Sequence, residues 1–197
     1  MAQVRDPLAL RALAHPLRWK LIDLIGSEQS ATATRCAEVL GESVASCGYH
    51  LGILAKYGYV EPVPDRAGRE KPWRLVTRRQ DLSAAGLDEA GALAAQAASE
   101  VFLDHELERI KDRLRGVDAE PPEWRAASYI SGTTRWMTAA ELKEIRDQLA
   151  EIEERYGDRD DDPARRPPGA REVGVFAVTS VAPPLPGPPG PPQPGPA

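Results

Sequence analysis

The chain has 197 residues, of which 42% are hydrophobic and 28% are charged, a composition typical of a globular protein. It holds no run of 18 or more apolar residues and only two cysteines, which excludes a membrane-spanning helix and a disulfide scaffold. The first residues carry charge and lack the apolar core of a secretory signal, so we expect a cytoplasmic protein with no membrane partner.

Charge is distributed unevenly along the chain. The net charge of −5, taken as a whole, argues against nucleic-acid binding. Residues 1–79, however, hold 12 Lys and Arg against 8 Asp and Glu, a net charge of +4, whereas residues 80–197 carry −9. Six of the cations lie in residues 66–79, beside the single acid Glu70. Because clustered cations can contact phosphates, the sequence predicts a cationic module joined to an acidic one.

The first part of the chain predicts four helices. A proline in the first turn indicates the start of the first two, at Asp6-Pro7 and at Pro16. Gly26 is expected to end the second helix, Ser43 is a good N-cap for the fourth, and Gly58 stops the fourth. The four expected helices cover residues 7–14, 16–26, 34–40 and 44–57.

Two β-prone runs, residues 59–63 and 72–77, follow the fourth helix. Between them lies the segment 64–69, whose proline, aspartate and glycine are typical of a hairpin tip. The expected fold class is therefore mainly α with a small β-hairpin.

Residues 84–115 favour one long helix. Its first half is rich in alanine, which lets another helix approach closely, and its second half carries an apolar stripe at helical spacing. The stripe consists of Leu103, Leu107, Ile110 and Leu114. A long helix with such a stripe needs a partner. That partner is either another part of the same chain or a second copy in a dimer.

Residues 116–182 predict an irregular stretch and one more helix. Four large side chains either line an effector pocket or cover the core: Trp124, Tyr129, Trp136 and Met137. Thr138 and Glu141 then form a capping box that starts a helix, and Gly157 stops it. The apolar seam of that helix, spaced as in a coiled coil, is Leu142, Ile145, Leu149, Ile152 and Tyr156. Residues 171–182 are β-prone and could add one strand.

Residues 183–197 consist almost entirely of proline and glycine. Such a segment cannot bury enough apolar surface to offset its ordering entropy, so we expect a disordered, extended tail. It is either a docking site for a proline-binding module or a tail without function.

The fourth helix is amphipathic when its residues are placed 100° apart. Its apolar side holds Val44, Cys47, Leu51 and Leu54, so Cys47 is expected to be a small buried hydrophobe. The opposite side holds Ala45, Ser46, Tyr49, Gly52 and Lys56. A short helix and a turn precede it, and a basic hairpin follows it. This is the pattern of a winged helix-turn-helix, whose second helix enters the major groove of DNA.

These motifs carry a family resemblance. The stretch LALRALAHPLRWKLI (8–22) resembles the opening of ArsR-type winged-helix transcriptional regulators, in which a His/Asp-Pro-x-Arg element begins the second helix. The stretch SVASCGYHLGIL (43–54) resembles their recognition helix, with Tyr49 in place of the first histidine of a His-His pair, and Tyr57-Gly58-Tyr59-Val60 matches the exit into the wing. The resemblance covers residues 8–79 and implies a dimeric, operator-binding transcription factor that responds to a signal.

The sequence and the resemblance together predict three regions. Residues 1–79 are a winged helix-turn-helix DNA-binding domain, 84–182 a helical dimerisation and effector region, and 183–197 the tail. The expected partners are double-stranded DNA, a second copy of the chain and an unidentified small-molecule effector. The recognition helix 43–57 would enter the major groove, and the wing 64–71 would follow the backbone or the minor groove. The candidate DNA-binding residues are Val44, Ala45, Ser46 and Tyr49 in the groove, His50 and Lys56 at phosphates, and Arg66, Arg69 and Lys71 in the wing.

Two alternatives stay open for this site. The reading face has no Arg, Asn or Gln that could contact a base edge by two hydrogen bonds, so specificity would come from Ser46, Tyr49, the wing and DNA shape. The same deficiency favours a winged-helix adaptor that binds protein instead of DNA. His50 is either a phosphate donor or a capped surface histidine.

The sequence predicts neither a metal site nor a cofactor nor an enzyme. The Cys-x-Cys box of the family's metal sensors is missing, because Cys36 stands alone, and Asp104-His105-Glu106 lacks a second histidine nearby. No phosphate-binding, dinucleotide, zinc-protease or nucleophile-elbow motif occurs. The acidic run 158–162 lacks the spacing of a calcium loop and is expected to be solvated charge.

Overall fold

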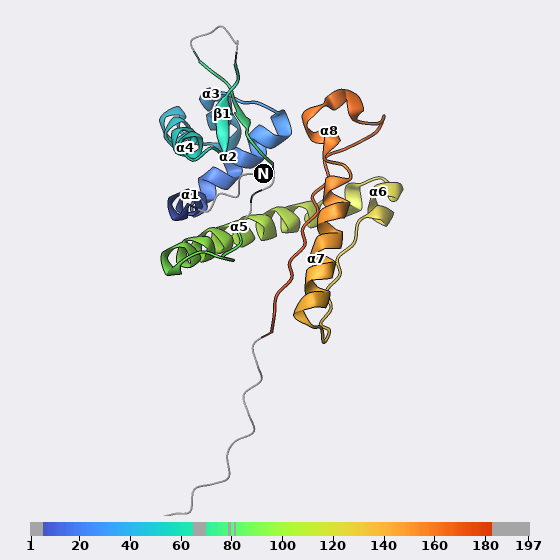
Figure 1. Ribbon diagram of the computed structural model, residues 1–197. Coiled ribbons are helices and arrows are strands. Elements are labelled where there is room, and N and C mark those ends of the chain that lie inside the picture. Colours follow the sequence, from blue (N-terminus) through green and yellow to red (C-terminus); the bar gives the residue numbers. More distant parts are fainter. Residues whose placement is uncertain (1–5, 65–69, 79, 81, 183–197) are drawn as a thin grey trace, which may run out of the picture. The chain divides into compact units, whose positions relative to one another are not determined.

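The computed structural model describes residues 6–64, 70–78, 80 and 82–182 (Figure 1). The hairpin tip 65–69, with Arg66 and Arg69, and the tail 183–197 lie outside the described residues. The chain divides into two compact units, residues 1–131 and 132–197. The first unit contains the first four helices, the hairpin and the long helix, and the separate domain expected over residues 1–79 stays a prediction.

The first four helices begin where local capping chemistry places them. The helices are α1 (Pro7–Leu13), α2 (Pro16–Glu28), α3 (Ala33–Leu40) and α4 (Val44–Lys56). A side chain caps each N-terminus by accepting a backbone N–H. The capping residues, in the same order, are Asp6, His15, Thr32 and Ser43.

The expected end of α2 is wrong. The helix continues two residues beyond Gly26 to Glu28, and Gly26 is buried within it. A Cβ atom at this position would stand 3.3 Å from Cδ1 of Leu75, so the glycine serves the close approach of a strand. Gly41, in contrast, adopts the left-handed conformation at φ 68° and ends α3, as expected.

The hairpin consists of β1 (Val60–Pro62) and β2 (Trp73–Leu75), which pair antiparallel with Val60 opposite Leu75. Both strands are shorter than the predicted runs because regular pairing covers only these positions. The mainly helical fold with a small two-stranded hairpin is therefore confirmed at this coarse level.

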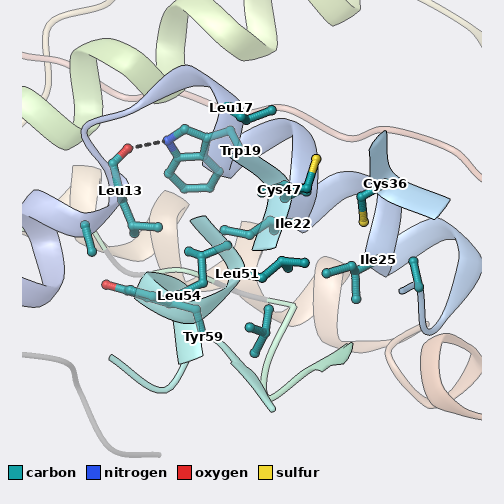
Figure 2. Close-up of a cluster of buried hydrophobic side chains, with 14 of the residues drawn as sticks. Leu13, Leu17, Trp19, Ile22, Ile25, Cys36, Cys47, Leu51, Leu54 and Tyr59 are labelled. Carbon is teal, nitrogen blue, oxygen red and sulfur yellow. Dashed lines mark hydrogen bonds between the residues drawn. The ribbon is translucent and has the colours of Figure 1, made fainter. Parts of the chain in front are cut away.

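The main core of the first unit is built by the first four helices and the hairpin, and one residue of the long helix that follows joins it (Figure 2). Its largest fully buried side chains are Leu13, Leu21, Ile25, Leu51, Leu54, Val60, Cys36 and Cys47. Two polar side chains reach backbone carbonyls within it. The indole N–H of Trp19 donates to the carbonyl of Leu13 at 2.8 Å, and the Tyr59 hydroxyl donates to that of Ala9 at 2.9 Å. Such satisfied groups fix the helices without leaving an unpaired polar atom in the core.

Helix α5 (Glu89–Arg115) begins five residues later than expected because Asp88, which accepts from the N–H of Gly91 at 2.8 Å, caps it. Its alanine-rich half packs within the chain: Ala94 and Ala95 cluster with Leu10 of α1, and Ala98 joins the main core. Several leucines of α5 stay exposed, among them Leu93 and Leu107. The small residues therefore find their partner inside the chain, whereas these leucines do not.

The end of the first unit is more helical than predicted, with a short 3₁₀ helix η1 (Val117–Ala119) and a helix α6 (Pro122–Ala127). Tyr129 and, in the second unit, Trp136 are almost fully exposed, so both expectations for them, a pocket lining and a core cover, are wrong. None of the helices in the described ranges combines the length and apolar character that a membrane crossing requires.

The second unit holds α7 (Ala139–Glu154), α8 (Asp158–Asp161) and the 3₁₀ helix η2 (Pro163–Arg165). The capping box of Thr138 and Glu141 is confirmed, because each residue's side chain accepts the other's backbone N–H. The strand expected at 171–182 does not form. A β-prone segment needs a neighbour to pair with, and within the described residues β1 and β2 pair only with each other and with Ala31.

Candidate nucleic-acid interface

Helix α4 separates a buried side from an exposed one. Cys47, Leu51 and Leu54 are fully buried, as expected. On the other side, the side chains at positions 45, 49 and 56 are exposed, and Tyr49 is 66% accessible. Ser46 is half-buried, and its backbone N–H donates to the Ser43 hydroxyl at 3.0 Å. The exposed side is therefore a continuous stripe along the helix, for which the Ser43 cap and the Gly41 turn supply the starting geometry.

Val44 departs from the helical-wheel expectation. The wheel places it with the apolar, core-facing residues, but its side chain is 48% exposed. Val44 is the first residue of α4, and this end of the helix lies outside the hydrophobic core. Val44 therefore belongs to the exposed stripe, where it was also predicted as a candidate groove residue.

Two glycines leave the middle of this stripe without side chains. Gly48 and Gly52 lie one helical turn apart and are both exposed. A Cβ atom built on either residue would meet nothing within 4 Å, so internal packing does not require glycine there. The backbone of α4 is thus open to a partner at this point. The sequence reasoning placed Gly52 on this face but did not single out Gly48.

His50 does not belong to the exposed stripe. It is a buried polar residue of α4, 9% accessible, and its ring packs at a tilt against that of His15 with centroids 4.3 Å apart. Its Nδ1 accepts a hydrogen bond from Nε of Arg18 at 3.2 Å. The interpretation as a surface histidine is therefore wrong, and burial argues against the phosphate contact, which stays a prediction. The partner that sequence spacing does not show is Arg18, which reaches His50 from α2.

The hairpin is clamped to α3 beside its basic tip. Oε1 of Glu70 accepts hydrogen bonds from the backbone N–H and the hydroxyl of Thr34, at 3.0 and 2.8 Å. Trp73 adds a bridge to Ala31 through two backbone hydrogen bonds. Lys71, next to Glu70, is exposed. The single acid of the basic segment therefore fixes where the cationic tip begins.

Two arginines of the basic segment have partners within the protein. Nη2 of Arg74 pairs with Glu61 across the two strands at 2.6 Å, and Nη2 of Arg78 donates to the carbonyl of Gly26 at 2.7 Å. These two arginines contribute to the fold. Of the candidate phosphate contacts, Lys56 and Lys71 are described and exposed, while Arg66 and Arg69 lie outside the described residues.

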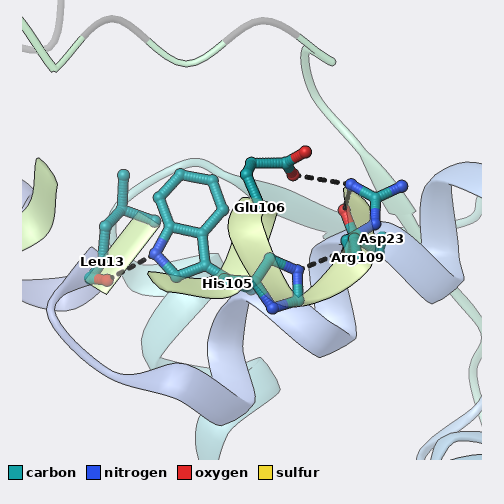
Figure 3. Close-up of polar contacts among 6 residues, drawn as sticks. Leu13, Asp23, His105, Glu106 and Arg109 are labelled. Atoms are coloured by element: carbon teal, nitrogen blue, oxygen red, sulfur yellow. Dashed lines mark hydrogen bonds and ion pairs between the residues drawn. The ribbon is translucent and has the colours of Figure 1, made fainter. Parts of the chain in front are cut away.

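A second polar cluster joins α2 to α5 (Figure 3). Nε2 of His105 lies 2.6 Å from Oδ2 of Asp23, and Arg109 contacts Asp23 at 3.2 Å and Glu106 at 2.6 Å. One carboxylate oxygen each of Asp23 and Glu106 and a ring nitrogen of His105 lie within 4.8 Å of one another, and such a set of ligand atoms could hold a cation. The Arg109 guanidinium already pairs with both carboxylates there, so the cluster acts as an ion-pair network between helices. Sequence reasoning missed it because Asp23 is 82 residues from His105.

Cys36 of α3 and Cys47 of α4 both lie in the core (Figure 2). Burial is the main cause that raises the pKa of Cys36 to about 11, and burial also raises the pKa of Cys47. Because the thiolate is the reactive form, both are poor nucleophiles and act as small apolar side chains. A redox role for Cys36 therefore receives no support from its surroundings.

The described residues therefore combine the exposed face of α4 with a basic hairpin that is fixed to α3. One polar contact, from Arg18 to His50, links α2 to α4, and the cluster around Asp23 links α2 to α5. The chain matches no protein-family model, and no curated protein matches it significantly.

Proposed function

We propose that the protein is a homodimeric transcriptional regulator that binds double-stranded DNA in the cytoplasm through a winged helix-turn-helix of the ArsR type. The observation that carries this proposal is the exposed stripe of α4, which follows α3 after a tight turn and precedes the basic hairpin. A helix that projects one face beyond its own domain can enter a major groove, which is wide enough to admit it.

The exposed side chains suit an interface that reads shape and methyl groups more than donors and acceptors. Val44 and Ala45 can contact the methyl group of thymine, and the hydroxyl of Tyr49 can reach a base edge or a phosphate. Gly48 and Gly52 let the helix backbone approach the duplex closely. Lys56 and Lys71, with Arg66 and Arg69, would contact phosphates. His50 leaves this set because it is buried.

A homodimer would present two copies of α4 to two half-sites roughly 34 Å apart, one turn of DNA. The exposed leucines of α1 and α5 support a dimer through these helices, since packing them against a second copy would remove apolar surface from water. They are Leu8, Leu93, Leu107 and Leu114. An effector would regulate DNA binding only if it bound one spacing of the two recognition helices better than another.

The experiment is recovery of genomic DNA fragments by the purified full-length chain, followed by footprinting of the recovered fragments. A protected region with two-fold symmetry, which weakens as salt rises, is the expected result. Recovery of no fragment above background, at low salt and with intact folded protein, would refute the proposal.

A second function is favoured by one observation. The exposed stripe of α4 combines a valine and a tyrosine with bare backbone and carries only Lys56 as a charge, a composition closer to a protein-binding surface than to a base-reading one. A winged-helix adaptor that binds protein would use the same face. It predicts no footprint, while substitution of Tyr49 would abolish capture of a protein partner.

A further inference from the structure

A polar cluster lies directly beneath the exposed stripe of α4 and joins three segments of the chain. The ring of His15, which precedes α2, packs against the ring of His50 in α4 with centroids 4.3 Å apart and a tilt of 43° between the ring planes. Arg18 of α2 contacts His50 through Nε at 3.2 Å and the carbonyl of Ala12 in α1 through Nη1 at 2.6 Å. On its outer side, His50 meets the ring of Tyr49 edge-on at 5.2 Å. The cluster thus supports the most exposed aromatic residue of the candidate interface.

The hydrogen bonds fix the protonation of both imidazoles. A guanidinium N–H can only donate, so Nδ1 of His50 must carry a lone pair. Nδ1 of His15 likewise accepts the backbone N–H of Leu17 at 3.2 Å, which caps α2. Both histidines are therefore neutral in this arrangement. A proton added at either Nδ1 would turn an acceptor into a donor that faces another donor.

The charged and titratable groups around the two rings mostly oppose protonation. Burial is the largest cause that lowers the pKa of both His15 and His50, and the positive charge of Arg18 lowers it further. His15 also lowers the pKa of His50. The carboxylate of Glu42, in the turn before α4, acts in the opposite direction on both. Tyr49 and Tyr57 act on Arg18 rather than on the rings.

We infer that His15, Arg18 and His50 form an acid-sensitive support that positions α4, and that proton uptake by the two histidines weakens the DNA-binding face. This inference rests on the proposed function. When both rings are protonated, three positive groups share one partly buried site. The hydrogen bonds that Nδ1 of His50 accepts from Arg18 and that Nδ1 of His15 accepts from the N–H of Leu17 are then lost. Arg18 and His50 are positioning residues, since neither is on the exposed stripe.

The sign of the effect follows from linkage. Folding favours the neutral rings, so the unfolded chain binds more protons in the pH range between the lowered pKa values and the ordinary histidine pKa of about 6.5. The stability that the neutral rings contribute is fully present above the ordinary histidine pKa of about 6.5. It is lost as the pH falls through the lowered pKa values of the folded protein.

The test compares the full-length protein with a double variant, His15→Asn with His50→Gln, between pH 8 and pH 5 at constant salt. Asparagine can still cap α2, and the glutamine amide oxygen can still accept from Arg18, but neither side chain takes up a proton in this range. Two quantities are measured: the midpoint of thermal unfolding, and the affinity for mixed-sequence duplex DNA.

In the original protein, both quantities should fall on acidification, the affinity by about fivefold or more, which is the lower end of typical coupling between two sites. The double variant should lose markedly less of each. His105→Gln, which removes the remaining histidine of the chain, is the matched control and should keep the original pH profile.

An unfolding profile of the double variant that overlays the original one would overturn the inference, as would a flat profile in the His105 variant. The unfolding measurement needs no DNA. If the chain binds no DNA at any pH, the proposed function fails while the acid-sensitive support is still tested by the unfolding profiles.

Discussion

Replacing Gly48 or Gly52 by alanine should stabilise the protein and weaken its binding to DNA. Each glycine occupies an exposed, interior position of α4, and an added Cβ would meet nothing within 4 Å. The alanine therefore gains its full helix preference, about 1 kcal/mol per site. In a unit of this size that corresponds to a rise of about 4 °C in the midpoint of thermal unfolding for each substitution.

The same methyl groups project from the face that would approach the duplex. If the backbone of α4 contacts the groove, one methyl should cost a contact worth roughly 1–3 kcal/mol, an affinity loss of about fivefold or more. Thermal unfolding and a DNA-binding titration on the same preparations measure the two effects. A higher unfolding midpoint together with a lower affinity for DNA would show that the substitution affects the interface, because damage to the fold would lower both quantities.

Gly91→Ala is the matched control for the stability effect. It makes the same chemical change in α5, but the new Cβ would stand 2.9 Å from Cβ of Leu87 and 3.1 Å from Oδ1 of the capping Asp88. Crowding should outweigh the helix preference there, so this variant should lose stability. If alanine at 48 and 52 lowers the unfolding midpoint as Gly91→Ala does, the reasoning about an open helix face is refuted.

Three further predictions test other parts of the proposal. Replacing Arg66 and Arg69 together by alanine should weaken DNA binding for all sequences and reduce the slope of log affinity against log salt by about one per lost phosphate contact; an unchanged slope would remove the wing tip from the interface. Asp23→Asn should lower stability by about 1–2 kcal/mol in urea unfolding, since it leaves the partners in α5 without their carboxylate, and equal stability would mean the network contributes little. Leu107→Glu should convert a dimer into a monomer in analytical ultracentrifugation, whereas a dimer of unchanged strength would place the interface elsewhere.

Local signals predicted the elements that position the candidate site. Ser43 and the Thr138–Glu141 pair form the expected caps, because an N-cap depends only on residues within three positions of it. The apolar spacing of Cys47, Leu51 and Leu54 likewise predicted which side of α4 is buried. Val44 was placed wrongly since a wheel assumes that the core extends along the whole helix.

What the sequence could not supply depends on distant partners. His50 is buried because Arg18, 32 residues away, donates to it, and no local pattern encodes that contact. The run 171–182 has strand composition but forms none, since a strand requires a neighbouring edge. Gly26 looked like a helix stop, and only its approach to Leu75 explains why the helix continues through it.

Helix α2 is the element through which the long helix and the candidate interface are connected. Arg18 holds α4 through His50, the ring of Trp19 stacks with Phe102 of α5 at 4.7 Å, and Asp23 binds His105 of α5 at 2.6 Å. The three residues of α2 that make these contacts lie within six positions of one another. A shift of α5 that keeps the contacts must therefore move α2 and α4 as well. A dimer formed through α5 would therefore set the spacing of the two α4 helices by rigid packing, and an effector that altered α5 would change that spacing. The proposed acid-sensitive contact at Arg18 lies on the same route, at the junction of α2 and α4, so its loss would weaken the link to α4 while the contacts to α5 remain intact.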